Sequence, residues 1–202
     1  MNTQQEISLE DIKEMIDRVN KNYKSQLNPD KCVISITYID TDLGMMIAGA
    51  TEKGICMLEF PVYRSLELEL KQLISSLKAP LVKGDNIYFG ILREQLNQYF
   101  KGTLREFDIP LDMVGTDFQK EAWLALLQIP YGSTSTYGKQ AELIGKPSAV
   151  RAVANANGKN KISIILPCHR VIGSDGSLTG YGGEIWRKKR LLDLELGIKM
   201  LL

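Results

Sequence analysis

Residues 164–173 read Ile-Ile-Leu-Pro-Cys-His-Arg-Val-Ile-Gly, an apolar run that ends in Pro167, Cys168 and the single histidine of the chain, His169. Proline has no backbone N–H and cannot continue a central strand, so the chain should leave the sheet at Pro167. A cysteine on such a bend, beside a potential base, has the arrangement that nucleophilic catalysis requires. His169 and Arg170 favour the reactive thiolate, so we expect a lowered pKa for Cys168. The alternative is a buried structural cysteine beside a surface histidine.

The composition is typical of a soluble globular protein, with 44% hydrophobic and 24% charged residues in a chain of 202. No apolar run reaches membrane-spanning length, and Met1–Asn20 is too polar and acidic for a secretory signal. The cysteines Cys32, Cys56 and Cys168 are far apart and form neither a disulfide framework nor a metal-binding pattern. We therefore expect a reducing, cytoplasmic location, with no membrane partner and no cofactor.

Charge is unevenly distributed along the chain. Residues 1–110 contain 13 Lys/Arg and 16 Asp/Glu, whereas residues 111–202 contain 12 and 8. Within 139–170 the only acid is Glu142, and the basic residues are Lys139, Lys146, Arg151, Lys159, Lys161 and Arg170. A local basic patch on a near-neutral protein is consistent with a small DNA-binding surface, and a solvated face with excess lysine would give the same pattern.

The first half of the chain predicts strands followed by helices, which is typical of an α+β fold. A helix should begin after Ser8, whose pairing with Asp11 would form a capping box. The elements expected next are a strand at 33–39, hairpin strands at 45–50 and 54–60, helices at 63–77 and 86–101, and an extended segment at 104–110. In the helix at 86–101, the side chains expected to face the core are Ile91, Leu92, Leu96 and Tyr99.

Near residue 111 the pattern changes to short helices separated by glycine and proline. A capping box at Thr116–Gln119 should open a helix that ends near Gln128. Helices at 137–144 and 147–157, joined by a turn at Gly145, predict a helix-turn-helix. Small residues in the second of these helices would let it approach a surface closely, with Arg151 projecting from it. A tightly packed core helix is the alternative.

Two further elements complete the expected second half. A strand at 162–166 should lead to the cysteine, and a helix at 184–195 should be capped by Gly197. The basic run at 187–190 in that helix should be solvated or face DNA.

With its Pro-Cys-His-Arg core behind a helix-turn-helix, the chain resembles the O6-alkylguanine-DNA alkyltransferases, also called methylated-DNA–protein-cysteine methyltransferases. The resemblance is close from Gly115 to about Gly197. It rests on Gly115–Gln119, Ile129–Gly132, the Tyr137 segment, Arg151–Ala154, Asn160, Pro167–Arg170, Gly180–Gly183 and Leu191–Glu195. The first half is similar to the family's N-terminal domain only in the order of its strands and helices.

The resemblance implies an α+β fold in two domains. A small N-terminal ribonuclease-H-like α/β domain would be followed by a mainly helical, winged-helix-like C-terminal domain that contains the helix-turn-helix. The expected limits are 1–31 for a helical N-terminal extension, 32–110 for the ribonuclease-H-like domain and 111–202 for the alkyltransferase domain.

The resemblance also implies a reaction. Cys168 would accept the alkyl group of O6-alkylguanine, and also of O4-alkylthymine, and keep it as a thioether, so each molecule would act once. His169 would act on Cys168 as general base through a water, and Glu195 would orient the imidazole. Tyr137 would supply a proton to the leaving guanine, and Asn160 would tie the recognition helix to the active-site strand.

The implied partner is double-stranded DNA, bound through its minor groove by a monomer. The damaged nucleotide must be flipped out of the stack, and Arg151 would fill the vacated space. Val150, Ala152 and Asn155 would surround Arg151 in the groove, and Val171, Tyr181, Gly182 and Gly183 would line the guanine pocket. Asn157 stands where relatives often carry a longer apolar residue against the flipped guanine, and Glu184 adds an acid at the pocket rim.

Some relatives bind zinc through N-terminal Cys and His ligands. Here His169 is the only histidine, and Cys32 and Cys56 lack partners, so no metal site is expected. Two other functions are open: a non-catalytic DNA-lesion-binding module or regulator of the same fold, and an unrelated cysteine hydrolase. Non-reactive relatives replace the acceptor cysteine, which this chain keeps, and a hydrolase would leave the helix-turn-helix unexplained.

Overall fold

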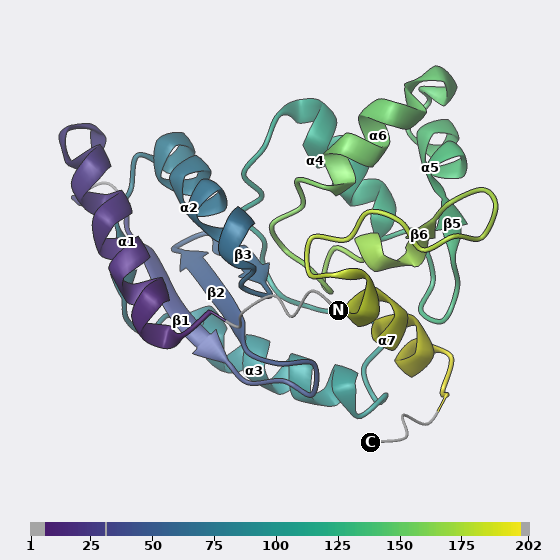
Figure 1. Cartoon of the computed structure of the whole chain (residues 1–202), viewed down its shortest axis with the longest axis horizontal. Helices are drawn as coiled ribbons and strands as arrows, with labels where there is room; N and C mark the ends of the chain where they lie inside the picture. The colour runs from purple at the N-terminus through teal and green to yellow at the C-terminus, as the bar shows by residue number, and fades with distance from the viewer. Residues whose placement is uncertain (1–6, 31, 199–202) are drawn as a thin grey trace.

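The structure is a computed structural model that describes residues 7–30 and 32–198. Residues 1–6 and 31 of the predicted extension, and residues 199–202 of the predicted second domain, lie outside the described residues. Figure 1 shows a sheet with long helices in the N-terminal part and a group of short helices in the C-terminal part. The α+β class predicted from the sequence is therefore confirmed.

A four-stranded sheet forms the centre of the N-terminal part, in the order β3-β2-β1-β4. The strands are β1 (Ile34–Ile39), β2 (Met46–Thr51), β3 (Gly54–Glu59) and β4 (Leu81–Lys83). The first three are antiparallel, which confirms the predicted strand and hairpin, and β4 runs parallel to β1. Strand β4 was not predicted, because its three residues are too few to give a detectable alternation of apolar and polar side chains.

Helices cover both faces of the sheet (Figure 1). On one face, α1 (Leu9–Tyr23) packs against α2 (Tyr63–Leu77), and on the other lies α3 (Ile87–Phe100). The capping box at Ser8 is present, and α1 ends in a 3-10 turn at Lys24–Gln26. On α3 the buried stripe is Phe89, Leu92, Leu96 and Tyr99. The prediction for Ile91 is wrong: it lies off this stripe and is 44% exposed.

The C-terminal part consists of short elements. They are α4 (Asp117–Leu126), β5 (Ser135–Thr136), α5 (Tyr137–Leu143), a 3-10 turn (Pro147–Ala149), α6 (Val150–Asn157), a 3-10 turn (Cys168–Arg170), β6 (Val171–Ile172) and α7 (Ile185–Glu195). The predicted capping box at Thr116 opens α4. Helices α4, α5 and α6 pack together, and Gly145, with φ of +69°, turns the chain between α5 and α6. This confirms the predicted helix-turn-helix.

A shared core joins the two parts of the molecule. One cluster of buried side chains contains residues of β2, α3, α4 and the segment that carries Cys168. The free edge of β3 also holds the C-terminal part, because the N–H of Leu58 donates to the carbonyl of Lys161 at 2.7 Å and the N–H of Ser163 donates to the carbonyl of Leu58 at 2.8 Å. The division at residue 110 stays a prediction, since the sheet edge supports the chain that leads to Cys168.

The predicted strand at 162–166 is wrong. Only Ile162 pairs with β3, and the chain then turns tightly, with the N–H of Leu166 donating to the carbonyl of Ile162 at 3.0 Å. Ile164 has a φ of +71°, a left-handed conformation that is costly for a β-branched residue. A short apolar run does not by itself distinguish a strand from a buried turn.

Candidate active site

Cys168, His169 and Arg170 lie on one 3-10 turn, Cys168–Arg170. All three are buried, with relative exposures of 6% for Cys168, 0% for His169 and 7% for Arg170. Pro167 precedes the turn, and the N–H of Cys168 donates to the carbonyl of Leu166 at 2.8 Å. The expected bend at the proline is present, and it directs the three side chains into the interior.

Asn160 fixes the surroundings of the Cys168 thiol. Its side-chain N–H group donates to Sγ of Cys168 at 3.3 Å and to the carbonyl of Leu166 at 2.9 Å. Its carbonyl oxygen accepts from the N–H of Ile162 at 2.9 Å. All hydrogen-bonding groups of this amide are therefore used to hold the turn before Cys168, and one of them reaches the sulfur.

The expected lowering of the Cys168 pKa is wrong. Burial raises the pKa of this thiol to about 11, against the lowering effects of the Asn160 hydrogen bond and of Lys188. The nearby Glu59 carboxylate raises it further. Arg170 is close to Cys168 in the sequence, but its guanidinium is directed to Glu195 instead of to the thiol. Cys168 is therefore a thiol at neutral pH in the resting protein.

His169 and Glu195 form a buried pair. Nε2 of His169 lies 2.8 Å from Oε1 of Glu195, and both side chains are 0% exposed. Burial lowers the pKa of His169, although the Glu195 carboxylate acts in the opposite direction. A neutral imidazole that donates from Nε2 to a carboxylate has its acceptor lone pair on Nδ1. Among the described residues, Nδ1 of His169 has no hydrogen-bond partner.

Four donors converge on the Glu195 carboxylate. Besides His169, they are Arg170, the Tyr99 hydroxyl at 2.7 Å and the N–H of Gly132 at 3.1 Å. Arg170 donates from Nε to Oε2 at 2.9 Å and from Nη2 to Oε1 at 3.0 Å. Burial alone would raise the pKa of Glu195, but the hydrogen bonds and charges of His169 and Arg170 lower it to about 2. Glu195 is therefore ionised at neutral pH.

The basic run of α7 is not a uniform solvated surface. Lys188 is 0% exposed, and its Nζ donates to the carbonyls of Val171 at 2.6 Å and Thr179 at 2.7 Å. Arg187 donates to the carbonyl of Leu43 at 2.9 Å. The prediction that the run is solvated or faces DNA is therefore wrong for Lys188, which ties together two segments beside Cys168.

The loop from Thr179 to Gly183 closes one side of the site. The Tyr137 hydroxyl donates to the carbonyl of Thr179 at 3.2 Å, and burial raises the Tyr137 pKa, so the phenol stays protonated. Tyr181 is buried, and within the described chain its hydroxyl has no hydrogen-bond partner. A Cβ on Gly183 would lie 2.9 Å from atoms of Phe60 and Tyr181, so a larger residue does not fit there.

The α6 residues predicted to meet DNA share one exposed surface, which consists of Val150, Arg151, Ala152 and Asn155. Val153 and Ala156 face inward, and the Trp123 indole of α4 donates to the carbonyl of Ala156 at 2.8 Å. The core-helix alternative is therefore correct for one face of α6 and wrong for the other.

The Asn157 side chain lies between α6 and α5. This side chain is 5% exposed and exchanges two hydrogen bonds with the Gln140 amide, at 2.7 and 3.0 Å. It therefore joins α6 to α5, and its contact with the flipped guanine stays a prediction. Glu184, expected at the pocket rim, accepts from the Trp186 indole at 2.9 Å and from Arg187 at 2.8 Å.

Comparison with known proteins identifies the family. The model for the 6-O-methylguanine DNA methyltransferase DNA-binding domain matches residues 117–197, and the model for the ribonuclease-like domain of the same family matches residues 34–113. The chain belongs to the 6-O-methylguanine DNA methyltransferase family. The resemblance noted from the sequence is thus confirmed, as is a ribonuclease-like N-terminal domain.

Relatives within the 6-O-methylguanine DNA methyltransferase family are similar over different lengths. The methylated-DNA–protein-cysteine methyltransferase of Methanosarcina barkeri is 45% identical over 157 residues, which are 78% of this chain and 94% of that protein. The protein of that name from Mycobacterium tuberculosis strain H37Rv is 63% identical over 102 residues, 50% of this chain. That match spans 62% of the mycobacterial protein, less than two thirds of its length.

Solved structures of this family have the same architecture. The M. tuberculosis O6-methylguanine methyltransferase matches with a TM-score of 0.66 and 43% identity, covering 85% of this chain and 96% of that one. M. tuberculosis OGT in complex with DNA matches with a TM-score of 0.69 and 43% identity, covering 81% of this chain and 94% of that one.

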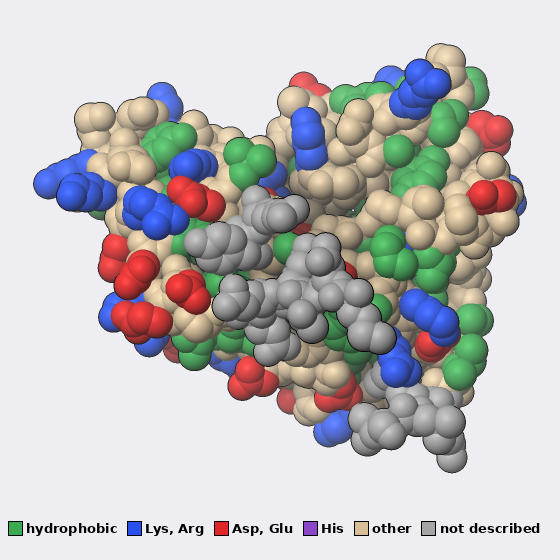
Figure 2. All heavy atoms as spheres, viewed as in Figure 1, with side chains coloured by type: hydrophobic (Ala, Val, Ile, Leu, Met, Phe, Trp, Pro, Cys, Tyr) green, Lys and Arg blue, Asp and Glu red, His purple; other side chains and the backbone are tan. Residues whose placement is uncertain are grey.

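The predicted basic patch is smaller in the structure than in the sequence. Lys161 and Arg170 are buried, and Lys146 forms an ion pair with Glu121. Lys139, Arg151 and Lys159 are exposed. On the face shown in Figure 2, the Lys and Arg side chains that can be seen lie spread over both parts of the molecule. Three of the six basic residues at 139–170 are therefore buried or paired with an acid.

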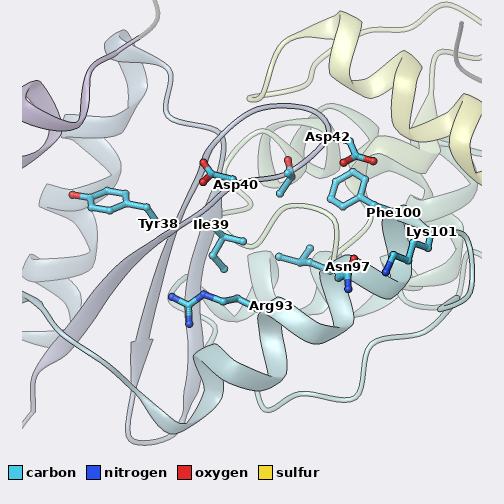
Figure 3. A pocket seen from close by; sticks show the side chains of 10 residues that line it. Tyr38, Ile39, Asp40, Asp42, Arg93, Asn97, Phe100 and Lys101 are labelled. Atoms are coloured by element: carbon cyan, nitrogen blue, oxygen red, sulfur yellow. The ribbon is translucent and has the colours of Figure 1, made fainter. Parts of the chain in front are cut away.

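A separate cavity of about 420 Å³ lies in the N-terminal part (Figure 3). It is lined by residues 38–42 and by Arg93, Leu96, Asn97, Phe100 and Lys101, and it contains none of the predicted site residues. Within residues 7–30 and 32–198, no helix is long and apolar enough to cross a membrane. The same residues contain no group of three or more His, Cys, Asp and Glu side chains placed to hold a metal.

The contacts that three residues make at the site were not predicted from the sequence. Arg170 belongs to the quoted motif, but nothing in the motif indicates its pairing with Glu195. Lys188 belongs to a run of four basic residues, and nothing in the sequence indicates that this one is buried. Tyr99 belongs to the other half of the chain, 96 residues before Glu195.

Proposed function

We propose that this chain repairs DNA by moving the alkyl group of O6-alkylguanine to Cys168. The named relatives support this reaction, and the M. tuberculosis complex with DNA supports DNA as the partner. The observation that carries the proposal is the buried set of Cys168, Asn160, His169 and Glu195, which joins a thiol, a base and a fixed carboxylate. We propose O4-alkylthymine as a second substrate of the same site.

The proposed step is a displacement at the alkyl carbon. Sγ of Cys168 forms a bond to that carbon while the bond from carbon to O6 breaks, and the electron pair stays on the guanine. The thiol proton passes through a water to Nδ1 of His169, whose positive charge is stabilised by Glu195 at 2.8 Å. Tyr137, protonated at neutral pH, supplies a proton to the departing guanine. The thioether has no leaving group that water can displace, so each molecule acts once.

The general base lowers the free-energy cost of deprotonating Cys168. With a pKa of about 11, forming the Cys168 thiolate at pH 7 costs roughly 5 kcal/mol. A base that removes the proton during the displacement avoids this separate charge in a buried site. Asn160, which donates to the sulfur at 3.3 Å, also stabilises the negative charge that develops there.

DNA binding is assigned to the exposed surface of α6. Val150, Ala152 and Asn155 are small or short side chains around Arg151, so the helix can enter a minor groove closely. We propose that a monomer binds there, that the damaged nucleotide flips into the site, and that Arg151 takes its place in the stack. Val171, Tyr181, Gly182 and Gly183 line the pocket that receives the base.

Mass spectrometry tests the reaction directly. The protein is mixed with a duplex that carries one O6-methylguanine, and the peptides are then analysed. We expect a gain of one methylene group (CH₂) on the Cys168 peptide, stoichiometric and without turnover. Cys168→Ala should keep DNA binding and lose the transfer. An unmodified wild-type protein that still binds the duplex would favour the non-catalytic lesion-binding alternative, and transfer by the variant would implicate Cys32 or Cys56.

A second experiment tests flipping. Arg151→Ala should slow transfer from duplex DNA at least tenfold and leave transfer from a free O6-alkylguanine base within twofold, since flipping costs a few kcal/mol only in a duplex. The matched control is Lys83→Ala, which removes an exposed cation from β4. Equal slowing with both substrates would refute the role of Arg151.

A further inference from the structure

Tyr99 connects the N-terminal part to the proposed active site. It lies on α3, the helix that covers the sheet face opposite α1 and α2. Its hydroxyl donates to Oε1 of Glu195 at 2.7 Å, and both groups are fully buried. This is the same oxygen that accepts from Nε2 of His169. A side chain of the ribonuclease-like part therefore touches the acid–base pair, one hydrogen bond away from His169.

The position of Tyr99 is fixed by aromatic packing. Its ring centroid lies 5.5 Å from Phe100, 5.5 Å from Phe107 and 5.9 Å from Tyr131, with edge-on geometry against Phe100 and Tyr131. Burial, reinforced by the Glu195 charge, raises the Tyr99 pKa well above the usual value for tyrosine. The hydroxyl is thus a permanent donor, held by its ring rather than by the hydrogen bond alone.

Several hydrogen-bond donors share Oε1 of Glu195, and this sharing affects how strongly the carboxylate stabilises a charged His169. Tyr99, His169 and Arg170 all donate to that oxygen, at 2.7, 2.8 and 3.0 Å. Each additional donor disperses the carboxylate charge, so the carboxylate stabilises an imidazolium less strongly. A base that must be neutral before it accepts a proton benefits from this weakening.

We propose that Tyr99 is a positioning residue that holds Glu195 in place and keeps His169 in its neutral, Nε2-protonated form, ready to accept the Cys168 proton at Nδ1. This inference rests on the proposed alkyl transfer for its role in the reaction. It assigns to the N-terminal part a direct contribution to the acid–base pair, in addition to supporting the chain through β3.

Other groups also face the pair and are unchanged in the test below. Arg170 comes from the same turn as His169, and the Lys188 ammonium of α7 acts on His169 through its charge. The Tyr131 ring lies under Arg170 at 5.7 Å and under Arg105 at 5.8 Å. Only the Tyr99 hydroxyl is removed by Tyr99→Phe, which keeps the aromatic packing.

The first measurement is NMR titration of the single histidine. Because His169 is the only histidine of the chain, its ring nitrogens can be followed without assignment of others. Compared with wild type, Tyr99→Phe should raise the His169 pKa by about half to one unit, a three- to tenfold change in its protonation constant. Tyr88→Phe is the matched control, because Tyr88 lies on the same helix and its hydroxyl donates outside the site, to the backbone carbonyl of Glu52. It should titrate like wild type.

The second measurement is the pH profile of single-turnover alkyl transfer. In Tyr99→Phe the acidic limb should move to higher pH with the His169 pKa, so the rate is lost on the acidic side of the profile and recovered on the alkaline side. A merely structural change would lower the rate equally at every pH. An unchanged histidine titration in Tyr99→Phe, or a uniform loss of rate, overturns the proposal.

The histidine titration and the transfer assay test the Tyr99 role and the alkyl-transfer reaction separately. The histidine titration does not require transfer, so a wild-type protein that transfers no alkyl group refutes the reaction and leaves the Tyr99 contact to be judged by NMR. If Tyr99→Phe does not fold, NMR of the wild-type protein tests the contact. The Tyr99 hydroxyl proton should then exchange slowly with water and show a nuclear Overhauser effect to the Nε2 proton of His169. Absence of that signal overturns the positioning role.

Discussion

Replacing Glu195 by glutamine tests the buried network at its centre. The substitution keeps the size of the side chain but removes the charge and replaces one carboxylate oxygen by an N–H donor group. Both oxygens of Glu195 face donors only: Tyr99, His169 and Arg170 at Oε1, and Arg170 with Gly132 at Oε2. The new N–H group therefore meets other donors in either orientation, and the Arg170 side chain, 8% exposed, loses its counter-ion.

The expected loss of stability at neutral pH is roughly 3–5 kcal/mol, the range found when one partner of a buried ion pair is removed. The Glu195 pKa gives an independent figure. Its value of about 2, against an ordinary value of 4.5, corresponds to roughly 3 kcal/mol. Because the folded-state pKa is depressed, this stability is present above about pH 4.5 and is lost as the pH falls toward 2.

Urea unfolding followed by circular dichroism measures both quantities. The difference between wild type and Glu195→Gln should be largest near pH 7 and should shrink below pH 4.5, because a protonated glutamate resembles glutamine. Glu94→Gln on α3 is the control, an exposed carboxylate whose loss should change stability by no more than about 0.5 kcal/mol. A difference below about 1 kcal/mol at pH 7, or one that does not depend on pH, would refute the reasoning.

Three further predictions concern the surroundings of the site. Alkylation of Cys168 by iodoacetamide, followed by peptide mass spectrometry, should accelerate about tenfold per pH unit from pH 7 to 10, because its pKa is about 11; a plateau by pH 8 would contradict this. Asn157→Leu removes the two hydrogen bonds to the buried Gln140 amide and should lower the free energy of unfolding by roughly 1–3 kcal/mol, as measured in urea. Adding Gln140→Leu in a double variant should restore part of this stability. Lys188→Met removes the hydrogen-bond donor from two backbone carbonyls beside the pocket. It should slow transfer at least tenfold in single-turnover kinetics and leave the DNA affinity, measured by fluorescence anisotropy, unchanged.

Much of the secondary structure could be predicted because its signals are local. The capping boxes at Ser8 and Thr116 mark the starts of α1 and α4, and the apolar spacing in 63–77 matches α2. The failures have physical reasons as well. The segment 162–166, apolar except for Ser163, is compatible with both a strand and a buried turn, and only the neighbouring β3 edge and the left-handed Ile164 decide between them.

The site was predictable only where its residues belong to motifs. Cys168, His169, Asn160 and Glu195 were expected together, and they lie together in the structure. Residues that act through distant contacts give no such signal: Tyr99 meets Glu195 from another part of the fold. The error on the Cys168 pKa has the same origin, because a list of neighbouring cations does not show burial.

A buried, protonated thiol is consistent with the proposed single use of Cys168 as nucleophile. A thiolate at rest would react with any small electrophile or oxidant, and under the proposed mechanism each such event would inactivate a molecule before it met DNA. Keeping the Cys168 pKa near 11 prevents this, and placing a neutral His169 beside it lets the proton leave when the alkyl carbon is in place. Under the proposed mechanism, the donors around Glu195 hold the carboxylate ionised and the imidazole neutral, so that the thiol is activated only when the substrate is in place.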